Sequence, residues 1–119
     1  MANVLIIDDQ EIIRDLIQDA LEEKGYKITT AEDGVEALEL CRKHTFDVVI
    51  TDVCMPRLEG VAVVRSLKSD YPKTKVIVVS GANYRKEYLG TAENFGADAI
   101  LEKPVDLDSL CEVIEKLCA

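Results

Sequence analysis

Short, continuous apolar runs alternate along this chain with longer stretches of helical periodicity, and this alternation restricts the possible folds more than any other feature. Three runs are rich in Val and Ile, at residues 4–7, 48–50 and 76–79. Two weaker runs lie at 27–30 and 99–101. Apolar β-branched runs without polar alternation are typical of parallel strands that are covered on both faces. The sequence therefore predicts five strands of a parallel sheet.

The intervening stretches predict five helices. An apolar stripe from Ile13 to Leu21 predicts a first helix, with Gly25 as its C-terminal stop. Asp33 and Glu36 resemble a capping box that opens a second helix. Three further helices are expected at residues 61–67, at 85–95, where Gly96 ends the helix, and from Leu107 to Cys118. In the last of these, Cys111 and Cys118 fall on the apolar stripe, so we expect core residues rather than a redox pair.

Strands that alternate with helices indicate an α/β, doubly wound fold with a five-stranded parallel sheet. Right-handed crossovers would place the five helices on both faces of that sheet. The length of 119 residues suits one domain, and no linker, repeat or low-complexity segment divides the chain. We therefore expect residues 1–119 to form a single domain.

Charge and hydropathy limit the classes of partner. The formal net charge of −9 argues against direct binding of nucleic acid, which needs clustered Lys and Arg. A charge that only keeps the protein soluble is the alternative to a role in binding cations or protein partners. No apolar run approaches the length that spans a membrane, and the chain does not begin like a signal peptide. These features predict a cytoplasmic protein without a membrane partner.

The four cysteines and the single histidine, His44, do not suit a zinc site, because no CxxC pair is present. We expect the cysteines to be small core residues or free thiols of a reducing cytosol. His44 follows Arg42 and Lys43 at an expected helix end, where a solvated side chain is the simplest interpretation.

Polar residues follow four of the predicted strands. Asp8 and Asp9 end the first strand, Asp52 the third and Ser80 the fourth, while the fifth leads to Lys103. Because ligands of an open parallel sheet bind beyond the carboxyl ends of its strands, we expect these side chains at one edge. Asp8-Asp9 alone would more often be a helix N-cap region, and it is the combination that points to a site.

Three carboxylates at one site would repel each other and raise their pKa values unless a cation intervened. Oxygen-only ligands suit a hard divalent ion such as Mg²⁺, which also binds phosphate oxygens. The sequence therefore predicts Mg²⁺ as the cofactor.

With these motifs, the whole chain resembles the receiver domain of two-component response regulators. The segments that carry the likeness are VLIIDD (4–9), AEDGVEA (31–37), DVVITDVCMP (47–56), Gly60, VVSG (78–81), GAD (96–98) and Lys103-Pro104. The resemblance implies a flavodoxin-like sheet with the strand order 2-1-3-4-5. It also implies a phosphoacceptor switch in a phosphorelay, not an enzyme that acts on a separate substrate.

The resemblance also assigns roles to the site residues. Asp52 would accept the phosphoryl group from a sensor histidine kinase or a histidine phosphotransfer protein. Asp9, Asp52 and the backbone carbonyl of Cys54 would ligate Mg²⁺, with Asp8 acting through a metal-bound water. Ser80 would hydrogen-bond a phosphoryl oxygen after transfer, and Lys103 would neutralise phosphoryl charge. The Lys103–Pro104 peptide bond is expected to be cis and to aim the ammonium group into the site.

Some positions depart from the family pattern. Ile100 stands where the family usually has an aromatic residue that swings inward, which puts the usual switch readout in doubt. Cys54 and Ala82, at positions that tune the lifetime of the phosphoryl group, are small, and Val105 replaces a frequent aromatic residue. The expected output surface is the face formed by the helix at 85–95, the strand at 99–101 and the helix from Leu107 to Cys118. Tyr84 and Tyr88, near the start of the first of these, would be exposed or pack against loops.

Two alternative functions remain. A pseudo-receiver would bind proteins without taking phosphate, but the complete set of site residues argues against it. A flavodoxin-like redox carrier would need a first loop rich in Gly, Ser and Thr to bind a flavin phosphate. Asp8-Asp9 would repel that phosphate.

Overall fold

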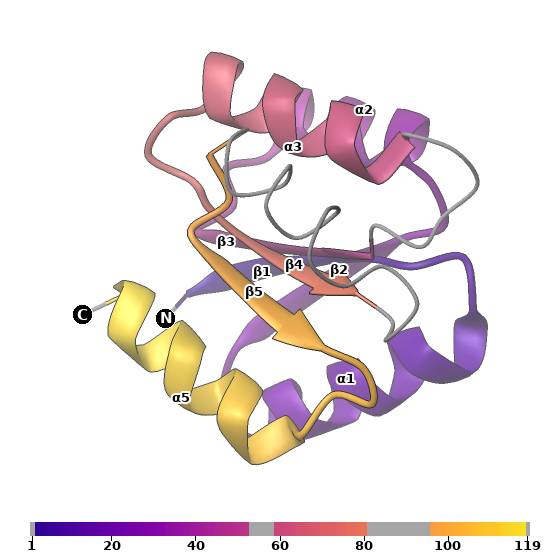
Figure 1. The fold of residues 1–119 in the computed structure, drawn as a ribbon, viewed down its shortest axis with the longest axis vertical. Coiled ribbons are helices and arrows are strands. Elements are labelled where there is room, and N and C mark those ends of the chain that lie inside the picture. The colour runs from indigo at the N-terminus through magenta and orange to yellow at the C-terminus, as the bar shows by residue number, and fades with distance from the viewer. Residues whose placement is uncertain (1, 53–58, 81–95, 119) are drawn as a thin grey trace.

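The computed structural model describes residues 2–52, 59–80 and 96–118, with side chains in 59–61 excepted, as five strands and four helices in these ranges (Figure 1). The strands are β1 (Asn3–Ile7), β2 (Lys27–Ala31), β3 (Val48–Asp52), β4 (Lys75–Ser80) and β5 (Ala99–Glu102). The helices are α1 (Glu11–Glu23), α2 (Gly34–Lys43), α3 (Glu59–Asp70) and α5 (Leu107–Cys118). The predicted helix at 85–95, with Tyr84 and Tyr88, lies outside the described residues.

All five strands are parallel and form one sheet in the order β2-β1-β3-β4-β5. This confirms the α/β doubly wound class and the strand order 2-1-3-4-5. The register brings Ile7 beside Thr51 and Asp52 beside Val79, so the carboxyl ends of β1, β3 and β4 meet at one edge.

Helices cover both faces of the sheet, with α2 and α3 on one side and α1 and α5 on the other (Figure 1). Successive strand residues point to opposite faces, so each strand supplies two cores. In β1, Leu5 and Ile7 belong to the cluster that contains α2 and α3. Val4 and Ile6 belong to the cluster of α1 and α5. This double burial explains why the strands are apolar throughout instead of alternating with polar residues.

The ends of two helices follow the expected local chemistry. Gly25 has a φ of 95° after α1, and Tyr26 N–H donates to the Leu21 carbonyl in a Schellman arrangement. At α2, the Asp33 side chain caps the helix by accepting from Glu36 N–H at 2.9 Å. The reciprocal bond of a capping box goes one residue further back, because the Glu36 carboxylate accepts from Glu32 N–H at 3.3 Å.

The outcome for the lone cysteines and the histidine is mixed. Cys41 and Cys111 are buried free thiols, as expected. Cys118 is exposed, so its assignment to the core face of α5 is wrong. It occupies the last described position of α5 and lines a surface pocket. His44 caps the C-terminus of α2 and is exposed, which confirms the prediction. Among the described helices, none is long and apolar enough to cross a membrane.

Candidate functional site

Three aspartates meet at the carboxyl edge of the sheet. Asp8 follows β1 directly, Asp52 is the last residue of β3, and Asp9 precedes the start of α1. Each offers a carboxylate oxygen, and these three oxygens lie within 4.8 Å of one another. Asp8 and Asp52 are each only 4% exposed, whereas Asp9 is exposed. The structure thus brings together the three acidic residues that the sequence placed at one edge.

Lys103 reaches into this cluster from the end of β5. Its Nζ donates to Asp52 Oδ2 at 2.6 Å, which is the distance of a strong, charge-assisted hydrogen bond. The Lys103 side chain is one quarter exposed, while the Asp52 side chain that it meets is almost fully buried. The Lys103–Pro104 peptide bond is cis, as expected. The basic residue predicted for the site therefore contacts the aspartate at the end of the central strand.

Ser80 ends β4 and is fully buried. The sheet register pairs Ser80 with Glu102, the residue before Lys103. The Ser80 carbonyl also accepts from Lys103 N–H at 2.7 Å. A backbone hydrogen bond therefore links Ser80, which carries the predicted hydroxyl group, to Lys103, which carries the ammonium group. Cys54, whose carbonyl was predicted as a metal ligand, lies outside the described residues.

The environment of Asp8 disfavours its charged form. Burial is the main cause that raises the pKa of this carboxyl above its ordinary value of 3.8. The hydrogen bond from Gln10 N–H to Asp8 Oδ1, 2.8 Å long, opposes the shift. The charges of Asp52 and Asp9 raise the pKa further, and that of Lys103 lowers it. Burial and the two neighbouring carboxylates therefore outweigh Gln10 and Lys103, and the net effect is a raised pKa for Asp8.

This donor set fits a hard divalent cation. Three carboxylates against one ammonium group leave a formal charge of about −2, which a divalent ion would neutralise. The cluster consists of oxygen donors alone, which favours Mg²⁺, Ca²⁺ or Mn²⁺ over zinc or copper. In the described residues, no histidine or cysteine belongs to a metal-sized cluster.

Sequence reasoning missed one residue beside this site. Arg14, on the second turn of α1, donates from Nη1 to the backbone carbonyl of Asp8 at 2.6 Å. A signal was available, because a cation near a helix N-terminus opposes the helix dipole and needs a nearby partner. The carbonyl itself could not be identified from the sequence, because it depends on the path of the loop.

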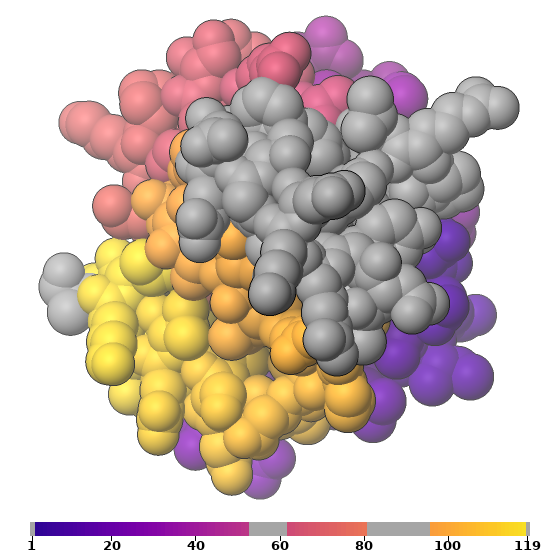
Figure 2. Space-filling view, viewed as in Figure 1, coloured from indigo at the N-terminus to yellow at the C-terminus, as the bar shows by residue number. Residues whose placement is uncertain are grey.

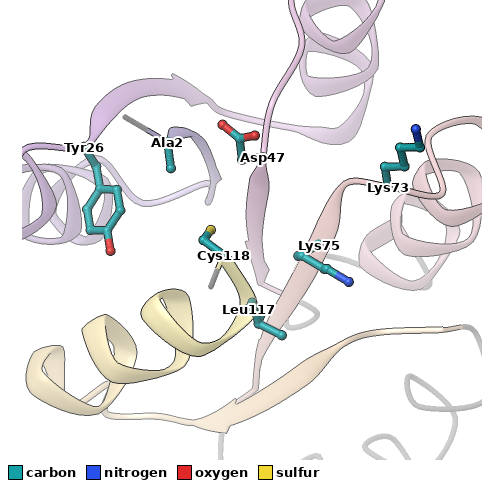
Figure 3. Close-up of a pocket in the computed structure, with 7 residues that line it drawn as sticks. All are labelled: Ala2, Tyr26, Asp47, Lys73, Lys75, Leu117 and Cys118. Atoms are coloured by element: carbon teal, nitrogen blue, oxygen red, sulfur yellow. The ribbon is translucent and has the colours of Figure 1, made fainter.

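Cavities lined by described residues also lie outside the acidic cluster, and two of them measure several hundred Å³. One, of about 410 Å³, is lined by residues at the amino ends of the strands and the end of α5, among them Asp47, Lys75 and Cys118 (Figure 3). It therefore lies at the opposite edge of the sheet from the aspartates. The other, of about 520 Å³, is a mainly apolar groove between α1 and the segment that begins with Lys103. This second groove borders the site.

Comparison with known proteins identifies the family. A family model described as the response regulator receiver domain matches residues 4–115. This chain belongs to the receiver domain family. The response regulator MprA of Mycobacterium sp. (strain KMS) is 36% identical over 107 residues, covering 90% of this chain and 46% of that protein. The sensor histidine kinase RcsC of Salmonella typhi is 34% identical over 111 residues, covering 93% of this chain and 12% of that protein. The chain thus spans about half the length of MprA and a small part of RcsC.

Solved structures agree with this assignment. The chemotaxis protein CheY4 of Vibrio cholerae has a TM-score of 0.89 and 33% identity, with 98% of each chain covered. A CheY-like receiver domain protein of Methanospirillum hungatei has a TM-score of 0.91 and 32% identity, covering 99% of this chain and 94% of that one. The receiver domain is a module of phosphoacceptor signalling in two-component systems, and the family match favours this role over the flavodoxin-like redox carrier.

Proposed function

We propose that this receiver domain is a phosphorylation switch in which Asp52 accepts a phosphoryl group. The donor would be a phosphohistidine on a sensor kinase or on a histidine phosphotransfer protein. The observation that carries the proposal is the buried Asp52 carboxylate, held by Lys103 at 2.6 Å inside a cluster of three carboxylates. The domain would act on itself only, and not as an enzyme with a separate substrate.

The chemistry requires a nucleophile and a means of neutralising charge. A carboxylate oxygen of Asp52 would attack phosphorus, and the P–N bond would break so that the imidazole nitrogen leaves with the electron pair. Lys103 lies where it can stabilise negative charge on the phosphoryl oxygens. Asp8, Asp9 and Asp52, with the carbonyl of Cys54, would hold Mg²⁺, which when bound supplies further charge stabilisation for phosphoryl transfer.

Ser80 would act after the transfer. It is fully buried at the end of β4, next to the strand that carries Asp52. Its hydroxyl would donate to a phosphoryl oxygen on Asp52. The Ser80 carbonyl accepts from Lys103 N–H. A movement of the Ser80 backbone would therefore also move the start of the segment between β5 and α5. This contact supports a role in the switch and not in the transfer itself.

The apolar groove beside the site suits the phosphodonor. Lys103 both lines the groove and contacts Asp52, so a protein seated there would bring its histidine close to the acceptor. Leu16 is 54% exposed at the groove, and Ile12, 75% exposed, is on the same helix. Exposed apolar residues of this size rimmed by polar ones are typical of protein contacts. We therefore expect the histidine-bearing donor to dock on α1.

The output surface would be the face formed by the predicted helix at 85–95, β5 and α5. Of this face, the structure describes β5 and α5, which lie side by side (Figure 2). Ile100 is partly buried against the cluster on the α2 and α3 side. Ile100 has no aromatic ring that could move inward on phosphorylation. The output signal would therefore depend on changes in the backbone and in neighbouring side chains. The free buried thiols Cys41 and Cys111 support a reducing, cytoplasmic setting.

Intact-mass measurement tests the proposal. Wild-type protein with Mg²⁺ and acetyl phosphate should gain the mass of one phosphoryl group, and chelation of the metal should prevent the gain. Asp52→Asn, which keeps the size but removes the anionic nucleophile, should gain none, whereas Ser80→Ala should still be labelled. A wild-type protein that stays unlabelled would support the pseudo-receiver alternative instead.

A further inference from the structure

Arg14 makes an unusual contact with the backbone of the acidic site. It is partly buried on α1, and its Nη1 donates to the Asp8 carbonyl oxygen at 2.6 Å. That carbonyl belongs to the peptide that joins Asp8 to Asp9. The guanidinium group therefore holds the short connection from which two of the three carboxylates project.

The sheet cannot supply this contact. Asp8 N–H makes a last strand-like hydrogen bond, at 3.2 Å, to the Ala31 carbonyl, but β1 itself ends at Ile7. Beyond this point the chain turns within two residues to Gln10, the N-cap of α1. The Asp8 side chain accepts from Gln10 N–H at 2.8 Å. With Arg14 on the carbonyl, the amide, the carbonyl and the carboxylate of Asp8 are each held by a different residue, namely Ala31, Arg14 and Gln10.

The charges around Arg14 act in opposite directions. A cation in the first turns of a helix faces the positive end of the helix dipole, which is unfavourable. It would also repel a divalent cation bound by the neighbouring aspartates. The charge-assisted hydrogen bond to the Asp8 carbonyl outweighs the dipole effect, and the net negative charge of the three carboxylates and Lys103 attracts a cation in the metal-free protein. Charge therefore explains why a cation is stable here, while the hydrogen bond at 2.6 Å specifies which backbone group the guanidinium holds.

We propose that Arg14 is a positioning residue, which holds the Asp8–Asp9 peptide so that both carboxylates are preorganised for a divalent cation. The inference rests on the proposed function of the same site, since it concerns the metal that Asp52 phosphorylation would use. It assigns Arg14 no contact with the metal or with the phosphoryl group.

The test is the Mg²⁺ affinity of Arg14→Gln, measured from amide chemical shifts during a titration. Outer residues that orient metal ligands typically cost 10–100-fold in metal affinity when replaced, and we expect about 10-fold or more. Loss of a positive charge near the site would by itself tighten cation binding, so the two explanations predict opposite signs. Arg14→Lys keeps the charge but not the planar guanidinium, and it should also bind more weakly than wild type.

Lys24→Gln is the matched control, because it removes one positive charge from the exposed C-terminal end of the same helix. It should bind Mg²⁺ like wild type. In metal-free protein, the amide of Gln10 should exchange faster in Arg14→Gln, since its acceptor on Asp8 is less well held. If Arg14→Gln folds and binds Mg²⁺ as tightly as wild type or more tightly, the positioning role is wrong. If the wild-type protein itself binds no Mg²⁺, the failure lies in the proposed function.

Discussion

Asp8→Asn should stabilise the metal-free protein while weakening its response to Mg²⁺. The wild-type carboxylate is 4% exposed, and its pKa is raised mainly by burial and further by the charges of Asp52 and Asp9. Asparagine has nearly the same shape and retains an oxygen that can accept from Gln10 N–H. The substitution therefore removes the charge with little loss of structure.

The magnitude follows from the separation of the charges. Two unit charges 4.8 Å apart interact by about 3.5 kcal/mol at an effective dielectric constant of about 20. Asp8 has two such neighbours, and the attraction to Lys103 offsets part of the repulsion. Solvent near the exposed Asp9 screens another part. We expect a net gain of about 1–3 kcal/mol in the free energy of unfolding at neutral pH.

Urea unfolding with and without Mg²⁺ measures both effects. A metal that binds only the folded wild type at ten times its Kd should stabilise it by about 1.4 kcal/mol. Asp8→Asn should show less of this stabilisation at the same Mg²⁺ concentration. Asp19→Asn is the matched control, because it removes an exposed charge on α1 about 12 Å further along the helix than its first residue. It should change neither quantity by more than a few tenths of a kcal/mol.

The gain should also depend on pH in a defined direction. Because the pKa of Asp8 is higher in the folded protein than its ordinary value of 3.8, folding favours the protonated form. The charged Asp8 carboxylate therefore lowers the free energy of unfolding of the wild type above its folded-state pKa. This destabilisation becomes smaller as the pH falls through that pKa. The two proteins should converge in acid. An Asp8→Asn protein that is less stable than wild type without metal at pH 7 would refute the repulsion argument.

Three further substitutions test local features of the fold, each by thermal or urea unfolding. Thr51→Val should raise stability by roughly 1 kcal/mol, because the buried Thr51 hydroxyl has no hydrogen-bond partner among the described residues; a loss would show that the hydroxyl is satisfied. Gly96→Ala should cost about 1–2 kcal/mol, since Gly96 has a φ of 97° and an added Cβ would lie 3.2 Å from Lys68 Cγ; an unchanged midpoint would contradict this. Asp33→Ala should cost about 1 kcal/mol by removing the cap on Glu36 N–H, and Asp33→Asn should retain most of it.

The fold was predictable because its main signals are local. Continuous Val and Ile runs mark strands that are buried on both faces, and Gly25 marks the end of α1 through its positive φ. The acidic cluster was predictable because parallel strands bring their carboxyl ends to one edge. In each case, residue type and order along the chain were sufficient.

The remaining features depend on three-dimensional paths that the sequence pattern does not encode. Arg14 contacts a backbone carbonyl, and no side-chain motif marks that acceptor. The shift of the Glu36 bond from residue 33 to residue 32 depends on the angle at which the chain enters α2. Cys118 continues the apolar periodicity of α5 in the sequence. Its exposure depends on which residues of the folded chain pack against the end of this helix.

Reductive trapping tests the central claim most directly. Borohydride reduces an aspartyl phosphate to homoserine, so peptide mapping after reaction with acetyl phosphate and Mg²⁺ locates the phosphorylated side chain. We predict homoserine at position 52, and none there when either reagent is omitted. Homoserine at Asp8 or Asp9 instead, or a phosphorylated protein that yields no homoserine, would contradict the assignment of Asp52 as the acceptor.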